Sequence, residues 1–298
     1  MDYEEFLWAQ EKDTYDTLEQ FEQLNKPIGN EVNRRLMRDF RVYMAVGGMP
    51  QAVEAFIDGK NFAEIDFVKR EIIKLYKDDF KKIDPRGRVS AIYDAVPAQL
   101  AAKKHYFVMS SATGKRKSKE DVELLYNLVD SKTVMICNNV TNPTITLVQT
   151  RGLTHYKLYL SDIGLFTSML FNDGSEAYST IYSKLLSDKI DANLGYLYEN
   201  AIAQIIKTSG RELYYHTWKP HGKSHAYEID FLIPSKMKLV PIEVKSSNIN
   251  NHKSIEVFSK KYSNIVSRRI MFSQKDVGKK EMLELKPIYL APIIISKL

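Results

Sequence analysis

Cysteine, long apolar runs and nucleotide-binding glycine loops are scarce or missing in this sequence of 298 residues. The single cysteine, Cys137, cannot form an internal disulfide, which fits a reducing compartment. No uncharged run approaches the roughly 18 residues that a transmembrane helix needs. The N-terminus, MDYEEFLWAQ, is acidic where a signal peptide would be basic. These absences predict a cytoplasmic protein without a membrane partner.

A P-loop is also missing, because no stretch matches G-x-x-x-x-G-K-[ST]. The paired glycines Gly47 and Gly48 stand before Met49-Pro50 instead. Paired glycines permit positive φ and proline disfavours helix in the residue before it, so this stretch predicts a tight turn between helices. The sequence therefore predicts no ATP site.

The residues that are present favour a folded protein with an uneven charge. Hydrophobic residues make up 44% and aromatic residues 11% of the chain, and its length favours two or three domains. Residues 1–80 carry 11 Lys and Arg against 17 Asp and Glu, whereas residues 200–298 carry 17 against 8. A basic surface around buried acids suits a polyanionic substrate, although ordinary solvated lysines would give the same count.

Hydrophobic periodicity divides the chain into three segments. Residues 1–80 predict helices, residues 81–170 predict helices followed by short strands, and residues 171–298 alternate helix and strand. We therefore expect a multidomain α plus α/β protein with a helical N-terminal region, a winged-helix-like middle and a C-terminal mixed sheet flanked by helices. The expected strands are Val134–Val140, Thr144–Val148, Tyr156–Leu160, Glu212–Trp218, Ala226–Ile233, Leu239–Lys245 and Arg269–Phe272.

The middle segment carries a basic loop next to a capped helix. Lys115, Arg116, Lys117 and Lys119 surround Ser118, which is expected to cap that helix. A winged helix can place a helix in a DNA groove, and packing between domains is the alternative use of the same shape. The first turn of this helix is acidic as well as basic, which counts against a transcription regulator that reads bases. We expect the four cations to make non-specific contacts with DNA, with a solvated turn as the alternative.

Three acids and one lysine are expected to converge in the C-terminal segment. Glu199 lies on an expected helix, Asp230 on one strand, and Glu243 and Lys245 on the next strand. Residues two apart in a strand share a face, so Glu243 and Lys245 point the same way, and Asp230 shares its polar face with Glu228. Each of the two strands therefore carries a pair of polar side chains on one face, Glu228 with Asp230 and Glu243 with Lys245.

Carboxylates with open coordination positions suit Mg²⁺ or Mn²⁺, because these hard ions prefer oxygen ligands and keep several waters. Asp230 and Glu243 are the expected main ligands, and Glu199 would bind directly or through water. Lys245 would orient the attacking water or stabilise the charge that develops on the phosphate. The alternative is structural, with Glu243 and Lys245 as an exposed pair and Glu199 as a helix-surface acid.

The order of these residues, on the strands EIDFLI and PIEVKSS, resembles the PD-(D/E)XK nuclease superfamily. The resemblance implies a restriction-endonuclease-like αβββαβ core for residues 171–298, with Glu199, Asp230, Glu243 and Lys245 as its catalytic residues. Other stretches are similar to the region after the ATPase core in a family of prokaryotic AAA-type ATPases, and together they cover nearly the whole chain. These stretches are MDYEEFLWA (1–9), GGMPQAV (47–53), VPAQLAAKKHYF (96–107), YKLYLSDIGL (156–165) and GYLYENAIA (195–203).

The ATPase resemblance implies that residues 1–80 are a remnant of the ATPase lid. Because Walker motifs are missing, the chain looks like a truncated member of the family or a fragment of a longer protein. Asp162 is expected to have a structural role between the winged helix and the nuclease-like segment. The first functional expectation is Mg²⁺-dependent hydrolysis of DNA. The alternative is a non-catalytic DNA- or protein-binding regulatory module that acts with an ATPase domain, and the sequence gives no oligomeric state.

Overall fold

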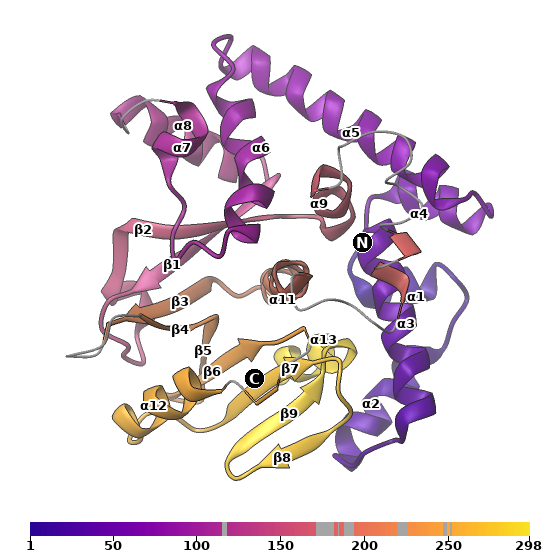
Figure 1. Ribbon diagram of the computed structural model, residues 1–298, viewed down its shortest axis with the longest axis vertical. Helices are drawn as coiled ribbons and strands as arrows, with labels where there is room; N and C mark the ends of the chain where they lie inside the picture. The colour runs from indigo at the N-terminus through magenta and orange to yellow at the C-terminus, as the bar shows by residue number, and fades with distance from the viewer. Residues whose placement is uncertain are drawn as a thin grey trace.

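A computed structural model of the chain shows an N-terminal layer of helices on one side and two sheets on the other, with helix α11 (Gly195–Thr208) near the centre (Figure 1). No helix among the described residues is long and apolar enough to cross a membrane. The structure describes the whole chain except residues 115–117, 171–181, 184, 188–193, 220–225, 247–248 and 251.

The first 83 residues form the helices that the periodicity predicts. Asp2 starts the first helix through a capping box with Glu5, and Asn61 starts the fifth through a capping box with Glu64. The helices are α1 (Tyr3–Trp8), α2 (Thr14–Leu24), α3 (Asn30–Val46), α4 (Pro50–Ile57) and α5 (Phe62–Ile83).

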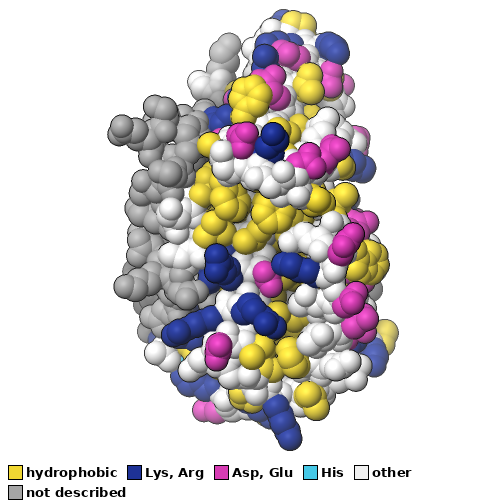
Figure 2. Space-filling model, turned by 90° about the vertical axis from the view of Figure 1, so that its right-hand side faces the viewer, with side chains coloured by type: hydrophobic (Ala, Val, Ile, Leu, Met, Phe, Trp, Pro, Cys, Tyr) yellow, Lys and Arg dark blue, Asp and Glu magenta, His cyan; other side chains and the backbone are white. Residues whose placement is uncertain are grey.

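One face of the molecule, which carries these helices, shows hydrophobic side chains gathered near its middle, with Lys and Arg side chains below them (Figure 2). Trp8 on α1, Ile57 on α4 and Phe67 on α5 are among the large hydrophobic residues that the protein exposes. Exposed apolar side chains that gather on one face are typical of a contact surface.

The middle segment is built from three helices, an antiparallel hairpin and a further helix. Ser118 caps the third of these helices through a capping box with Asp121, as the sequence predicts. Strands β1 and β2 then pair in antiparallel register. These elements are α6 (Arg88–Ala101), α7 (Met109–Thr113), α8 (Lys119–Asp130), β1 (Val134–Val140), β2 (Arg151–Leu160) and α9 (Ile163–Leu170).

The strand expected at Thr144–Val148 is wrong. This stretch forms a loop that ends in a short 3₁₀ turn at Leu147–Thr150, and the second strand starts earlier than predicted. Two threonine hydroxyls bond locally: Oγ1 of Thr144 donates to the carbonyl of Thr146 at 3.3 Å, and Thr146 Oγ1 lies 3.1 Å from Oε1 of Gln149. Such local bonds compete with strand pairing.

Two glycines allow the N-terminal helices to approach α9 at backbone distance. A β-carbon on Gly164 would lie 2.3 Å from the carbonyl oxygen of Val46, and Gly47 has a φ of +86°. Asp162 holds this junction, because its Oδ2 accepts the backbone N–H of Gly48 at 2.7 Å. Asp162 therefore has a structural role, as expected, but it links α9 to the N-terminal helical segment, whereas the sequence placed it between the winged helix and the nuclease-like segment.

The C-terminal segment contributes to both sheets. The first sheet has the order β2-β1-β3-β4 and the second has the order β5-β6-β7-β9-β8. Strand β3 pairs in parallel with β1, so the middle hairpin and the C-terminal segment share one sheet. The elements are β3 (Leu213–Trp218), β4 (Tyr227–Ile229), β5 (Phe231–Ser235), β6 (Lys238–Val244), α12 (Lys253–Lys261), β7 (Arg269–Ser273), β8 (Gly278–Lys280), β9 (Leu283–Pro287), a 3₁₀ turn at Ile288–Leu290 and α13 (Ala291–Ser296).

The single strand expected over Ala226–Ile233 is divided at Asp230. Strand β4 before it belongs to the first sheet and β5 after it belongs to the second. The carboxylate of Asp230 accepts the backbone N–H of Val244 at 2.7 Å. Its side chain therefore takes a bond that a strand neighbour would otherwise make, and Asp230 lies where the chain changes sheet.

Candidate metal centre

A cleft of about 270 Å³ opens at this change of sheet. Its walls come from α11, from strand β2, from the loop after α6, and from the ends of β4 and β6. Acidic and basic side chains both line it. They are Glu199, Glu228 and Asp230 among the acids, and Lys103, Lys104, His105, Lys157 and Lys245 among the bases.

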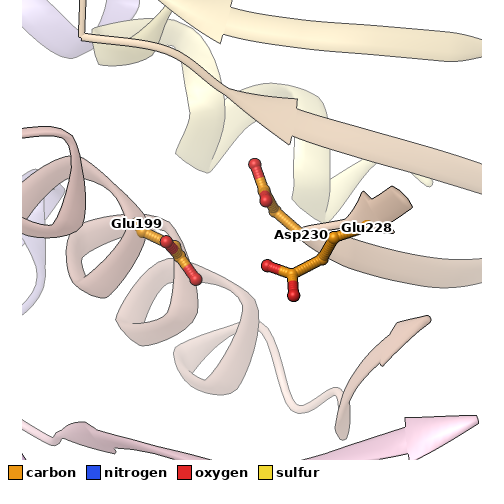
Figure 3. Close-up of side chains that lie close together, drawn as sticks. All are labelled: Glu199, Glu228 and Asp230. Carbon is orange, nitrogen blue, oxygen red and sulfur yellow. The ribbon is translucent and has the colours of Figure 1, made fainter. Parts of the chain in front are cut away.

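Three carboxylates meet in the cleft. Glu199 points from α11 toward Glu228, in the middle of β4, and toward Asp230 (Figure 3). One oxygen of each lies within 4.8 Å of the others. The structure thus brings together two of the predicted site residues, Glu199 and Asp230. It adds Glu228, which the alternation of the strand placed beside Asp230 but to which the sequence gave no role.

Glu243 and Lys245 lie on one side at the end of β6, as strand alternation predicts. Lys245 Nζ is 2.7 Å from Glu243 Oε2, and the glutamate side chain is only 2% exposed. The alternative that these residues form an exposed surface pair is therefore wrong for Glu243. Its other oxygen, Oε1, is buried and has no hydrogen-bond partner among the described residues.

Lys157 and Tyr159 are functional candidates that the sequence analysis missed. The ammonium of Lys157, on β2, is 2.9 Å from Glu199 Oε1 and 2.6 Å from Glu228 Oε1. The Tyr159 hydroxyl donates a short hydrogen bond to the same oxygen of Glu199. A lysine and a tyrosine two positions apart, alternating with the apolar residues Leu158 and Leu160 of the strand, were the available sign, because they share one face.

His105 reaches the same cluster from the loop after α6. Its Nδ1 lies 2.8 Å from Oε2 of Glu228. This hydrogen bond raises the pKa of His105. Burial opposes the charge of Glu228, but Lys157 and His105 outweigh it and lower the pKa of that carboxyl. Glu228 is therefore an ionised group with the Lys157 ammonium on one oxygen and the His105 ring on the other.

Burial and mutual repulsion act on the other two acids. Burial, followed by the nearby charge of Glu243, raises the pKa of Asp230 well above its usual range. Burial also raises the pKa of Glu243, although Lys245 opposes this shift. Two carboxyls held together under burial favour a bound proton, and a cation would relieve the same repulsion.

We expect the Asp230→Asn protein to be more stable than the wild type at pH 8, with a smaller difference at pH 5. A carboxyl whose pKa is raised by folding binds protons more tightly in the folded state, so it lowers stability as the pH rises from about 4 through its folded pKa. An amide carries no charge and removes that loss, and it can still accept the Val244 N–H. Urea unfolding at both pH values measures the difference.

The control is Asp58→Asn, at the exposed end of α4. It should leave the dependence of stability on pH unchanged. A loss of stability in Asp230→Asn that is equal at pH 5 and pH 8 would mean that the charge of Asp230 does not strain the fold.

The residues present fit a divalent cation. The oxygens of Asp230 and Glu243 are hard ligands of the kind that Mg²⁺ and Mn²⁺ prefer. An oxygen as deeply buried as Glu243 Oε1 would ordinarily be hydrogen-bonded, and it lacks such a partner among the described residues. A cation beside it would supply the missing interaction.

The predicted DNA-contacting loop is only partly described. Lys115, Arg116 and Lys117 lie outside the described residues. Lys119 is exposed in the first turn of α8 and does not line the cleft. Its contact with DNA stays a prediction.

Two family models match the chain. Residues 37–176 match a domain of unknown function, DUF8612, and residues 194–290 match another domain of unknown function, DUF4143. The second is a domain found C-terminal to AAA ATPase domains, so an ATPase-associated family agrees with the resemblance in the sequence. The candidate cleft draws residues from both matched regions.

Comparison with curated proteins gives no match. Among solved structures, protein VC1899 from Vibrio cholerae is similar at 11% sequence identity, with a TM-score of 0.24. The likeness covers 88% of this chain and 59% of that protein, so the chain spans less than two thirds of that protein's length.

Proposed function

We propose that this chain binds Mg²⁺ or Mn²⁺ between Asp230 and Glu243 and hydrolyses phosphodiester bonds of DNA. The observation that carries the proposal is the buried Oε1 of Glu243, which has no hydrogen-bond partner among the described residues. Lys245 stands beside this pair at the wall of the cleft. A ligand oxygen, a second carboxylate and a positioned lysine are the parts that such a reaction needs.

The order of elements supports a restriction-endonuclease-like assignment for the C-terminal segment. Helix α11 precedes strands β3 to β6, and α12 then connects β6 to β7 in parallel. This is an α, β, α, β sequence around the acids. Helices α6, α7 and α8 followed by the β1–β2 hairpin likewise support a winged helix in the middle segment.

A bound divalent ion would polarise a phosphoryl oxygen and lower the pKa of a water molecule. Lys245 keeps its charge, because Asp230 and Glu243 raise its pKa against the effect of burial. With its side chain 27% exposed, its ammonium can face a phosphate in the cleft and stabilise the charge that develops there. Lys103 and Lys104 at the rim can hold flanking phosphates.

The proposal is tested by incubating the purified chain with single- and double-stranded DNA in Mg²⁺ or Mn²⁺. Cleavage should occur, should stop on addition of EDTA, and should be lost in Asp230→Asn. Because that variant is expected to be at least as stable as the wild type at neutral pH, unfolding cannot explain the loss. A wild-type chain that cuts none of these DNAs with either ion would refute the nuclease proposal for this chain.

A second candidate is a non-catalytic module that binds DNA or a partner protein and acts with an ATPase domain. It is favoured by the pairing of Glu199 and Glu228 with Lys157 and His105 of the middle segment. These contacts leave fewer free carboxylate oxygens than the site of a two-metal nuclease would need. Association with an ATPase domain fits the position of DUF4143 domains after such domains. DNA binding without cleavage, unchanged by EDTA, would support this function instead.

A further inference from the structure

Lys157 occupies the place of a cation in the acidic cluster. Its ammonium bridges Glu199 Oε1 and Glu228 Oε1 at 2.9 and 2.6 Å, and its side chain is only 6% exposed. It also lies 5.3 Å from the centre of the Tyr215 ring, whose face attracts a positive charge. A lysine this deeply buried would lose its charge unless strong partners compensated for the burial.

The two glutamates are largely saturated by these contacts. Glu199 Oε1 accepts from Lys157 and from Tyr159. Glu228 is held by Lys157 on one oxygen and by His105 on the other. A divalent ion between Glu199 Oε1 and Glu228 Oε1 would have to displace the ammonium, because the ammonium already lies between these two oxygens.

Asp230 and Glu243 differ from the two glutamates in their hydrogen bonds. Neither has a hydrogen bond to Lys157 among the interactions of the described residues, and Glu243 Oε1 is buried without a hydrogen-bond partner there. Asp230 nonetheless lies within 4.8 Å of both glutamates. The cluster therefore holds one cation, the ammonium of Lys157, beside the acids Asp230 and Glu243, where a buried oxygen of Glu243 has no hydrogen-bond partner among the described residues.

We propose that Lys157 is a built-in second cation, so that the cleft accepts one divalent metal ion and Lys157 replaces the other ion of a two-metal arrangement. Paired metal ions stabilise both the attacking and the leaving oxygen of a phosphoryl transfer. Here the ammonium takes one of these roles as a fixed positive charge. The position of the divalent ion at Asp230 and Glu243 is taken from the proposed function. The role of Lys157 as a cation does not depend on that function.

Lys157 and the acids that it contacts come from different segments of the chain. The acids belong to the C-terminal segment, whereas Lys157 belongs to the β1–β2 hairpin and His105 to the loop after α6. The hairpin is held against the C-terminal segment by the parallel pairing of β1 with β3. The charge balance of the cleft is therefore complete only when the middle segment is docked in this position.

The test is the number of Mn²⁺ ions that the full chain binds, measured by electron paramagnetic resonance of free Mn²⁺. The wild type should bind one ion and Lys157→Met should bind two, because methionine is an unbranched side chain one atom shorter than lysine and removes the charge. Lys157→Arg, which keeps the charge, should stay at one ion. Adding Glu228→Gln to Lys157→Met should remove the additional ion.

Thermal unfolding gives a second measurement in the same proteins. Lys157→Met leaves two partly buried glutamates without the ammonium between them, so its Tm should fall and should recover when Mn²⁺ is added. Lys69→Met is the matched control, because Lys69 is another buried lysine, whose ammonium contacts Ala45 and Tyr182 and lies 3.9 Å from one carboxylate, Asp66, which Arg70 still holds at 2.6 Å. Its Tm should fall without recovery in Mn²⁺.

The proposal is overturned if the wild type binds two ions, or if Lys157→Met binds no more ions than the wild type and shows no recovery of Tm. A wild type that binds no ion, with a variant that gains one, would support the role of Lys157 while refuting the metal ion of the proposed nuclease. The two proposals can therefore fail separately.

Discussion

Replacing Gly164 by alanine is expected to lower the free energy of unfolding by about 3 kcal/mol or more. The added β-carbon would lie 2.3 Å from the carbonyl oxygen of Val46 and 2.5 Å from the Cα of Gly47. Both neighbours are backbone atoms, so neither can rotate away as the end of a side chain would. The contact between α3 and α9 must open instead, and it also contains the buried bond from Gly48 to Asp162.

Thermal and urea unfolding of Gly164→Ala measure this effect, and the loss should lower Tm by roughly 6–12 °C. Gly195→Ala is the matched control, because Gly195 also stands at the start of a helix. Among the residues that the structure describes, its added β-carbon would meet only Ser246 Oγ, at 3.6 Å, which is an ordinary contact. Alanine is the better helix former, so this control should be neutral or more stable by up to about 1 kcal/mol. Equal stability of the two variants would show that the backbone around Gly164 can shift to accommodate a β-carbon at little cost in free energy.

The sequence predicted the elements that carry the candidate site better than it predicted their pairing. Periodicity and capping found α8 and α11, and alternation placed Glu243 and Lys245 on one side of β6. Strand propensity is a local property and does not record which sheet a strand joins. The change of sheet at Asp230 depends on a bond to Val244, 14 residues away, so it could not be read from the strand itself.

Lys157 and His105, the cleft residues that the sequence did not predict, were missed for the same reason. Lys157 and His105 approach Glu228 from positions 71 and 123 residues earlier in the chain, and no local pattern connects such positions. Lys157 stands in the stretch Tyr156–Leu160, which is otherwise apolar or aromatic, and this is unusual for a lysine without a buried partner. The sequence could therefore mark Lys157 as exceptional, but only the pairing of β1 with β3 shows which acids it meets.

Lys245→Met is expected to lower the rate of metal-dependent cleavage by about 10²–10³-fold while the affinity for Mn²⁺ is kept or increased. The ammonium of Lys245 is 2.7 Å from Glu243 and compensates the repulsion between Glu243 and Asp230. Without it the two acids attract a divalent ion more strongly. The same change removes the positive charge that faces the phosphate, so binding and rate should move in opposite directions. Single-turnover cleavage and Mn²⁺ binding measure the two effects in one preparation.

Lys207→Met is the control for a lost lysine. Lys207 lies 2.7 Å from Glu212 in an exposed pair at the end of α11, and exposed pairs of this kind contribute little. It should change neither the affinity for Mn²⁺ nor the rate of cleavage. If Lys245→Met instead loses affinity and rate together, Lys245 holds the carboxylates in place and does not act on the substrate. Opposite movements are not expected from general damage to the fold, because damage that separates Asp230 from Glu243 would weaken the binding of the ion as well.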